Sequence, residues 1–177
     1  MMYSSIKHYD HHSTRHGDTD PRCSCKGCKC NYKSILLIQS LLLPGSVPTD
    51  KTVTTQSRGF GTVTILNNKT FYINIFVNFI HDCIMSHIHI KNTSNPKTNG
   101  PIVLWLTNTQ SQPVSVENSF LVSKMFSSND FVGPLKGYSI EEFLHYLGAN
   151  QLYFNVHTVK YPNGEIAGDL LLSHSFQ

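Results

Sequence analysis

The sequence predicts an all-β protein: an antiparallel, Greek-key-type β-sandwich with one short helix and a disordered N-terminal tail. From residue 35 onward, short runs of β-forming residues alternate with turn residues at intervals of about ten residues, which is typical of sandwiches and barrels. The hydrophobic content of 40% is enough for a core, and a charged content of 14% is too low for a coiled coil or a highly charged disordered chain.

The clearest predicted strand covers residues 70–80. Phe71, Ile73 and Ile75 fall on one face and Tyr72 and Asn74 on the other, which is the two-residue period of a half-buried strand. Seven further strands are predicted by composition and turn signals, at residues 35–43, 59–66, 85–91, 102–107, 119–126, 152–159 and 166–172. We expect the single tryptophan, Trp105, to lie in the core.

One short helix is predicted after residue 138. Ser139 followed by Glu142 forms a capping-box pattern, and Phe143 and Leu147 supply an apolar helical face before Gly148.

Residues 1–33 show no periodicity, and we expect a flexible Cys- and His-rich tail there, followed by a sandwich domain over residues 34–177. The net charge of +3 comes without a basic run, so nucleic acid is not an expected partner. No run of 18 apolar residues is present, so no membrane span is expected. The start of the sequence lacks the apolar segment of a signal peptide, which favours a cytoplasmic or similarly reducing location.

The tail contains a C-x-C-x2-C-x-C cluster, formed by Cys23, Cys25, Cys28 and Cys30. In a reducing compartment such a cluster more often binds metal than forms a disulfide framework, and thiolates favour Cu(I) and Zn(II). Oxidative cross-linking of chains and the absence of any role are the alternatives. The fifth cysteine, Cys83, is expected to be a small buried residue.

Three histidines inside the predicted sandwich form a second candidate metal site. His87 and His89 are two residues apart on one strand and therefore project from the same face. His157, on the strand at 152–159, supplies a third imidazole if the two strands are close. Three imidazoles suit copper or zinc with a fourth position open. The structural alternative is that these histidines hydrogen-bond to loop backbone and fix the rim of the sandwich.

Several segments together resemble the CHRD domain, the module first described in chordin. They read S-H-I-H-I, N-G-P-I-V-L-W-L, G-P-L-K-G-Y and L-Y-F-N-V-H-T-V-K-Y-P-N-G-E-I-A-G-D-L, and the resemblance extends over residues 36–173. It implies an immunoglobulin-like or dismutase-like sandwich. Family members are often secreted, and in chordin-like proteins the module occurs in extracellular binders of growth factors.

The same segments are distantly similar to Cu/Zn superoxide dismutase. This resemblance implies that His87, His89 and His157 stand at copper-ligand positions. The zinc subsite has no clear counterpart, and Ala167 replaces the usual arginine of the family's E-I-R-G, which removes a cation that would steer superoxide.

Three functions follow as alternatives. The first is a non-catalytic binding or structural module with a protein partner or self-assembly, in which copper, or zinc instead, is bound. The second is a copper redox protein with superoxide dismutase-like activity, the one enzymatic alternative. The third is copper storage or delivery, in which the tail cysteines pass Cu(I) to the three histidines.

Overall fold

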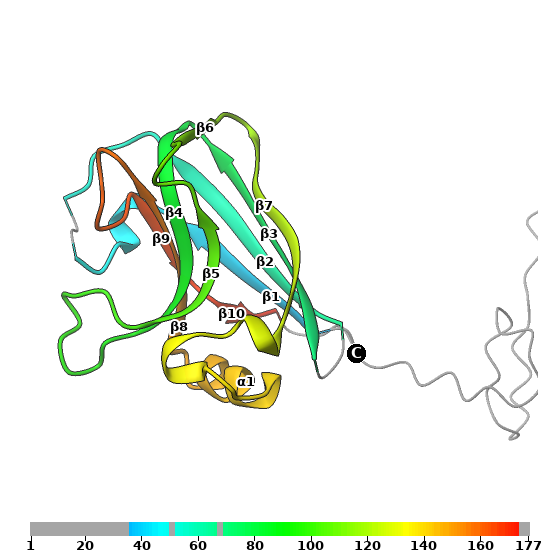
Figure 1. The fold of residues 1–177 in the computed structure, drawn as a ribbon. Helices are drawn as coiled ribbons and strands as arrows, with labels where there is room; N and C mark the ends of the chain where they lie inside the picture. Colours follow the sequence, from blue (N-terminus) through cyan, green and yellow to red (C-terminus); the bar gives the residue numbers. More distant parts are fainter. Residues whose placement is uncertain (1–35, 50–51, 67–68, 174–177) are drawn as a thin grey trace, which may run out of the picture. The chain divides into compact units, whose positions relative to one another are not determined.

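Two antiparallel sheets form the domain in the computed structural model, which describes residues 36–49, 52–66 and 69–173 (Figure 1). The first sheet has the strand order β10-β1-β2-β3-β7, and the second has the order β5-β4-β8-β9, with β6 also paired to β4. The strands are β1 (Leu36–Leu42), β2 (Arg58–Ile65), β3 (Thr70–Asn78), β4 (Ile80–Ile90), β5 (Ile102–Asn108), β6 (Val114–Val116), β7 (Ser119–Ser127), β8 (Leu152–Thr158), β9 (Ile166–Asp169) and β10 (Leu171–Leu172). The predicted all-β sandwich is confirmed.

The core lies between the two sheets and is built from the alternating side chains that the sequence predicts. Phe71, Ile73 and Ile75 of β3 are fully buried against residues such as Ile88 of β4 and Phe154 of β8. The pairing of β2 with β3 is continuous, and that of β4 with β8 is continuous from Met85 to Ile90, so one apolar face per sheet is turned inward.

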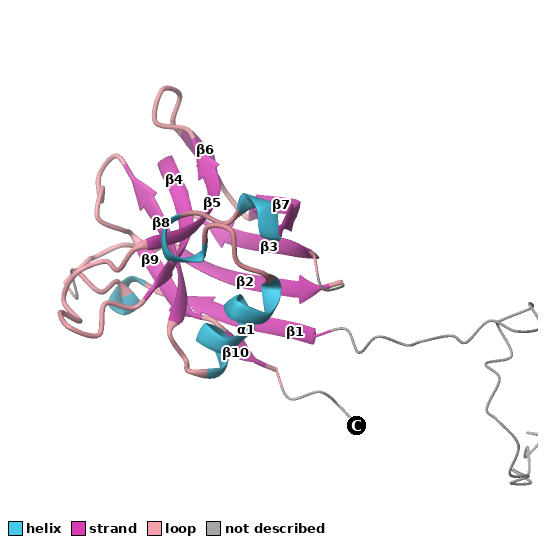
Figure 2. Ribbon diagram, turned by 60° about the horizontal axis from the view of Figure 1, so that its bottom comes forward, coloured by secondary structure: helices cyan, strands magenta, loops and turns pink. Residues whose placement is uncertain are grey.

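The predicted helix is confirmed as α1 (Ile140–Gly148), which lies close to β10 at one end of the sandwich (Figure 2). Ile140, Phe143 and Leu147 form its buried face. The predicted capping box is not formed at this helix, since the Ser139 side chain makes no cap hydrogen bond. Three short 3-10 helices accompany the sheets, at Pro44–Ser46, Ser128–Asp130 and Gly133–Leu135.

The strand boundaries differ from the prediction in three places. The apolar run at 70–80 divides between β3 and β4 because Phe79 takes a positive φ of 56°, so that β4 begins at Ile80 and not at residue 85. The three-residue strand β6 was not predicted. The predicted strand at 166–172 is split into β9, which pairs with β8, and β10, which pairs with β1.

The two sheets are joined along one side by this last segment. Leu43, at the end of β1, and Ala167 of β9 form an antiparallel bridge with N···O distances of 2.9 and 3.2 Å. The outer face of the first sheet carries an apolar row across four strands, made of the exposed Leu41, Phe60 and Phe120 and the half-buried Phe76.

Candidate metal centre

The three predicted histidines meet on the outer face of the second sheet. In the pairing of β4 with β8, His87 lies opposite Asn155, and Met85 lies opposite His157. His157 is therefore diagonal to His87, while His89 follows two residues along the same face of β4. The alternation of the two strands brings the three imidazoles together.

The distances between the rings fit a shared ion. Nδ1 of His87 lies 3.2 Å from Nε2 of His157, and the ligand atoms of all three histidines lie within 4.8 Å of one another. Nitrogens bound at about 2.0–2.1 Å to one ion are roughly 3–4 Å apart, so only small ring movements would close the set. Among the described residues, this is the one group of three or more His, Cys, Asp or Glu side chains whose ligand atoms lie close enough together to hold a metal ion.

Two of the imidazoles are held by loop carbonyls. Nδ1 of His89 donates to the carbonyl oxygen of Gly100 at 2.8 Å, and Nδ1 of His157 donates to that of Pro162 at 3.0 Å. Because a carbonyl oxygen accepts only, each Nδ1 carries the proton and each Nε2 presents a lone pair. A hydrogen bond of this kind on the far nitrogen is the usual support of a metal-binding histidine.

The centre is closed and uncharged. His87, His89 and His157 are 1%, 3% and 3% exposed, and Nε2 of His87 and of His89 are buried without a hydrogen-bond partner. Burial lowers the pKa of His87 to about 3 and of His89 to about 4, and it also lowers the pKa of His157. All three imidazoles are therefore neutral at physiological pH.

Aromatic side chains cover two of the rings. Trp105 packs edge-to-face on His87 with ring centroids 4.1 Å apart, and Tyr153 stacks on His89 at 5.1 Å. The prediction that Trp105 lies in the core is wrong: it is 39% exposed and stands on the outer face of β5, opposite His87. The run IVLWLT is apolar on both faces, so its period does not show which face turns inward.

A polar network that the sequence did not predict holds the loops over the centre. Asn99 accepts hydrogen bonds from the Tyr153 hydroxyl and the Asn155 amide, both at 3.2 Å, and Asn155 is fully buried. Gly100 makes the close approach of this loop possible, because a Cβ there would lie 1.7 Å from the Ile90 carbonyl oxygen. The Asn99-Gly100 dipeptide is the feature of the sequence that could have indicated a tight loop at this place.

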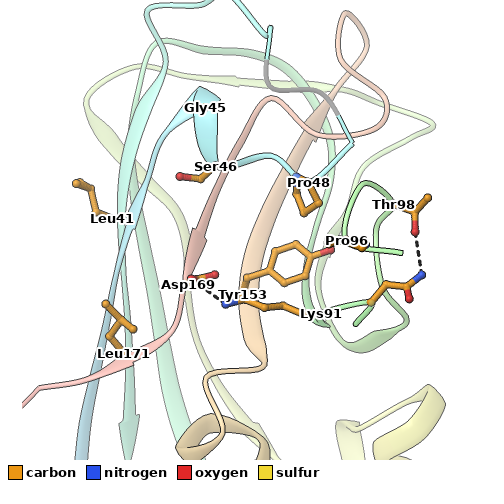
Figure 3. A pocket seen from close by; sticks show the side chains of 11 residues that line it. Leu41, Gly45, Ser46, Pro48, Lys91, Pro96, Thr98, Tyr153, Asp169 and Leu171 are labelled. Carbon is orange, nitrogen blue, oxygen red and sulfur yellow. Dashed lines mark hydrogen bonds and ion pairs between the residues drawn. The ribbon is translucent and has the colours of Figure 1, made fainter. Parts of the chain in front are cut away.

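A cavity of about 500 Å³ lies beside the centre, with Tyr153 in its wall (Figure 3). Lys91 and Asp169 form an ion pair of 2.8 Å on the same wall. Tyr153 therefore separates this cavity from His89, on which its ring stacks.

The cysteines are divided between described and undescribed parts of the chain. Cys23, Cys25, Cys28 and Cys30 lie outside the described residues, as does the predicted tail, so the predicted thiolate site stays a prediction. Cys83 is a buried free thiol, as expected, and burial raises its pKa to about 11.

Among the described residues, no helix has the length and apolar character needed to cross a membrane. In comparisons with known proteins, no curated protein and no solved structure matches the chain, so the similarity to Cu/Zn superoxide dismutase stays a prediction. The model of the CHRD domain matches residues 39–170, which include every strand except β10 and the start of β1, and all three histidines of the centre. The chain thus belongs to the CHRD domain family.

Proposed function

We propose that this CHRD domain is a non-catalytic binding module whose three-histidine centre holds one transition-metal ion, copper in the first place and zinc as the alternative. The observation that carries the proposal is the convergence of three buried imidazoles, in which Nδ1 of His87 lies 3.2 Å from Nε2 of His157 and Nε2 of His89 is buried without a hydrogen-bond partner. An ion bound by the three imidazoles would satisfy the lone pair on Nε2 of His89, which the fold leaves without a partner.

The structural alternative accounts for only part of this arrangement. Hydrogen bonds from His89 to Gly100 and from His157 to Pro162 would fix the two loops without an ion. Each buried polar atom left without a partner, however, costs about 1–3 kcal/mol. Nε2 of His87 and Nε2 of His89 are two such atoms, and the loop hydrogen bonds alone give no reason for them, whereas metal binding would supply a partner for the one on His89.

Binding is favoured over turnover by the closure of the centre. A dismutase-like reaction would need an open position for superoxide, whereas the most exposed of the three histidines is 3% exposed. Ala167, where the family usually has arginine, is fully buried beside Val47 and Tyr153 and offers no cation to attract an anion.

Metal analysis of the full chain, produced without a metal-affinity tag, tests the proposal. The protein is loaded with Cu or Zn, freed of excess ion, and measured by mass spectrometry of the elements. Four proteins are compared: the natural sequence, a variant with Cys23, Cys25, Cys28 and Cys30 changed to Ser, and His157→Asn and His145→Asn in that Ser background. His145 is exposed on α1 and serves as the matched control.

We expect one ion per chain in the Ser background and in its His145→Asn derivative, and none in the His157→Asn derivative. Equal metal content in the two His variants, or no metal once the four cysteines are replaced, would refute the centre. Circular dichroism of each variant establishes that loss of metal does not come from loss of the fold.

A further inference from the structure

We infer that the three-histidine centre selects monovalent copper, Cu(I), over Zn(II) and Cu(II). This inference rests on the proposed metal binding and adds to it the charge and oxidation state of the ion. It follows from the charge, the burial and the surroundings of the three imidazoles.

The first argument is charge. The ligand set consists of three neutral imidazoles, and no Asp, Glu or Cys belongs to the group. A bound ion would therefore keep its full charge inside the protein.

The second argument is the cost of burying that charge. The Born free energy of burying an ion rises with the square of its charge. Burying a dication therefore costs about four times as much as burying a monocation of similar size. At exposures of 1–3% the three side chains give almost no access to water that would reduce this cost. The neutral, closed centre consequently penalises Zn(II) and Cu(II) far more than Cu(I).

The third argument is coordination. Zn(II) in proteins is almost always bound by four ligands, so at three histidines it would need water or an anion in the fourth position. Here Trp105 packs against His87 and Tyr153 stacks on His89, so that aromatic side chains cover two of the three rings and leave less room for such a ligand. Cu(I) forms stable complexes with three nitrogen donors and therefore needs no added water ligand.

A residue with a soft sulfur donor occupies the same face of β4. Met85 lies opposite His157 in the register of β4 and β8 and shares its strand face with His87. Side chains paired in this way have Cβ atoms about 4.5–5.5 Å apart. The Met85 sulfur lies 3.5 Å from Nε2 of Gln110, and a thioether on this face would favour Cu(I), because soft sulfur donors are selective for it.

The inference is tested with the full-length Ser-substituted chain, so that tail thiols do not compete. Cu(I) is titrated under anaerobic conditions against a chromophoric Cu(I) chelator, and Zn(II) and Cu(II) are titrated against chelators of their own. Trp105 is the single tryptophan of the chain and packs on His87, so its fluorescence reports occupancy of this centre directly. The His157→Asn derivative is the negative control.

We expect the dissociation constant for Cu(I) to lie at least about 100-fold below those for Zn(II) and Cu(II), because the second charge is buried without compensation. Only Cu(I) at one equivalent should change the Trp105 fluorescence, and His157→Asn should abolish the change. Zn(II) or Cu(II) bound as tightly as Cu(I) would overturn the inference and leave the proposed metal centre standing. Failure of all three ions to bind would instead overturn the proposed function.

Discussion

At the scale of single residues, burial keeps both kinds of metal-binding side chain in the sandwich uncharged. It lowers the pKa values of the three histidines and raises the pKa of Cys83 to about 11. A neutral imidazole is ready to bind a metal ion, whereas a protonated thiol is not. The same physical effect therefore prepares the histidines for coordination and leaves Cys83 inert.

Cys83 should resist thiol reagents in the native protein. At pH 8 a thiol with a pKa of about 11 is ionised in only about one molecule in a thousand, and the side chain is fully buried. In the chain with the four tail cysteines changed to Ser, we expect no labelling over minutes in buffer and complete labelling in urea. A native labelling rate like that of a free thiol would contradict the burial described for Cys83.

The sequence was sufficient to find the imidazoles but not their supports. The H-x-H spacing placed His87 and His89 on one face, and the predicted strand at 152–159 supplied His157 as a third imidazole, on the condition that the two strands lie close together. The carbonyls of Gly100 and Pro162, by contrast, lie in loops, where no period relates residue type to conformation. Trp105 was misplaced because strand β5 is apolar on both of its faces.

At the scale of elements, a buried carboxylate ties the segment before β2 to the turn between β8 and β9. Glu165 is 5% exposed and accepts hydrogen bonds from the hydroxyls of Thr55, Ser57 and Thr158. The same turn contains Pro162, whose carbonyl oxygen holds His157. The clamp at Glu165 therefore stabilises one wall of the metal centre.

Glu165→Ala should lower the free energy of unfolding by about 2–4 kcal/mol, since it leaves a cavity, removes the acceptor of the buried Thr158 hydroxyl and removes one of two partners of Thr55 and Ser57. Glu165→Gln keeps an acceptor oxygen and should cost less. Urea denaturation monitored by circular dichroism measures both, with the exposed Glu117→Ala as the matched control, expected within about 0.5 kcal/mol of the natural chain. Equal free energies of unfolding for Glu165→Ala and Glu117→Ala would show that the hydrogen bonds to Glu165 do not stabilise the fold.

Most strands and the helix could be predicted from the sequence, but the pairing of the strands could not. Alternating apolar residues identified β3 and its neighbours, and the apolar spacing identified α1. The division of residues 166–172 between two sheets escaped the pattern, because a two-residue period fixes a strand's faces but not its pairing partner. The strand β6 has three residues, too few for any period.

At the scale of the whole molecule, a cluster of phenylalanines joins the first sheet to the helical end of the sandwich. Phe71 of β3 stacks on Phe126, Phe131 and Phe143 with ring centroids 5.7–6.1 Å apart. These partners come from β7, from the segment after it, and from α1. One side chain thus connects three parts of the chain.

Phe71→Ala should lower the free energy of unfolding by about 3–5 kcal/mol, because it leaves a cavity at this junction. The matched control is Phe60→Ala, at a position on the apolar row of the same sheet, 43% exposed, where we expect a loss of about 1 kcal/mol or less. Thermal and urea unfolding compare the two variants. A loss at Phe60 as large as that at Phe71 would mean that the outer row is covered in solution.

The pairing of β1 with β10 has a consequence for how the protein is made. The first described strand, β1, is hydrogen-bonded to the last one, β10. Strand β9, which immediately precedes β10 in the chain, completes the second sheet. On the ribosome, neither sheet can be completed until the final strands have left the exit tunnel, although the β2–β3 hairpin forms earlier. Pairing of strands so far apart in the sequence is slow. Until it occurs, the partly folded chain exposes unpaired strand edges, which promote aggregation. Biosynthesis of this sandwich therefore depends on protection of the nascent chain until residue 172 has left the exit tunnel.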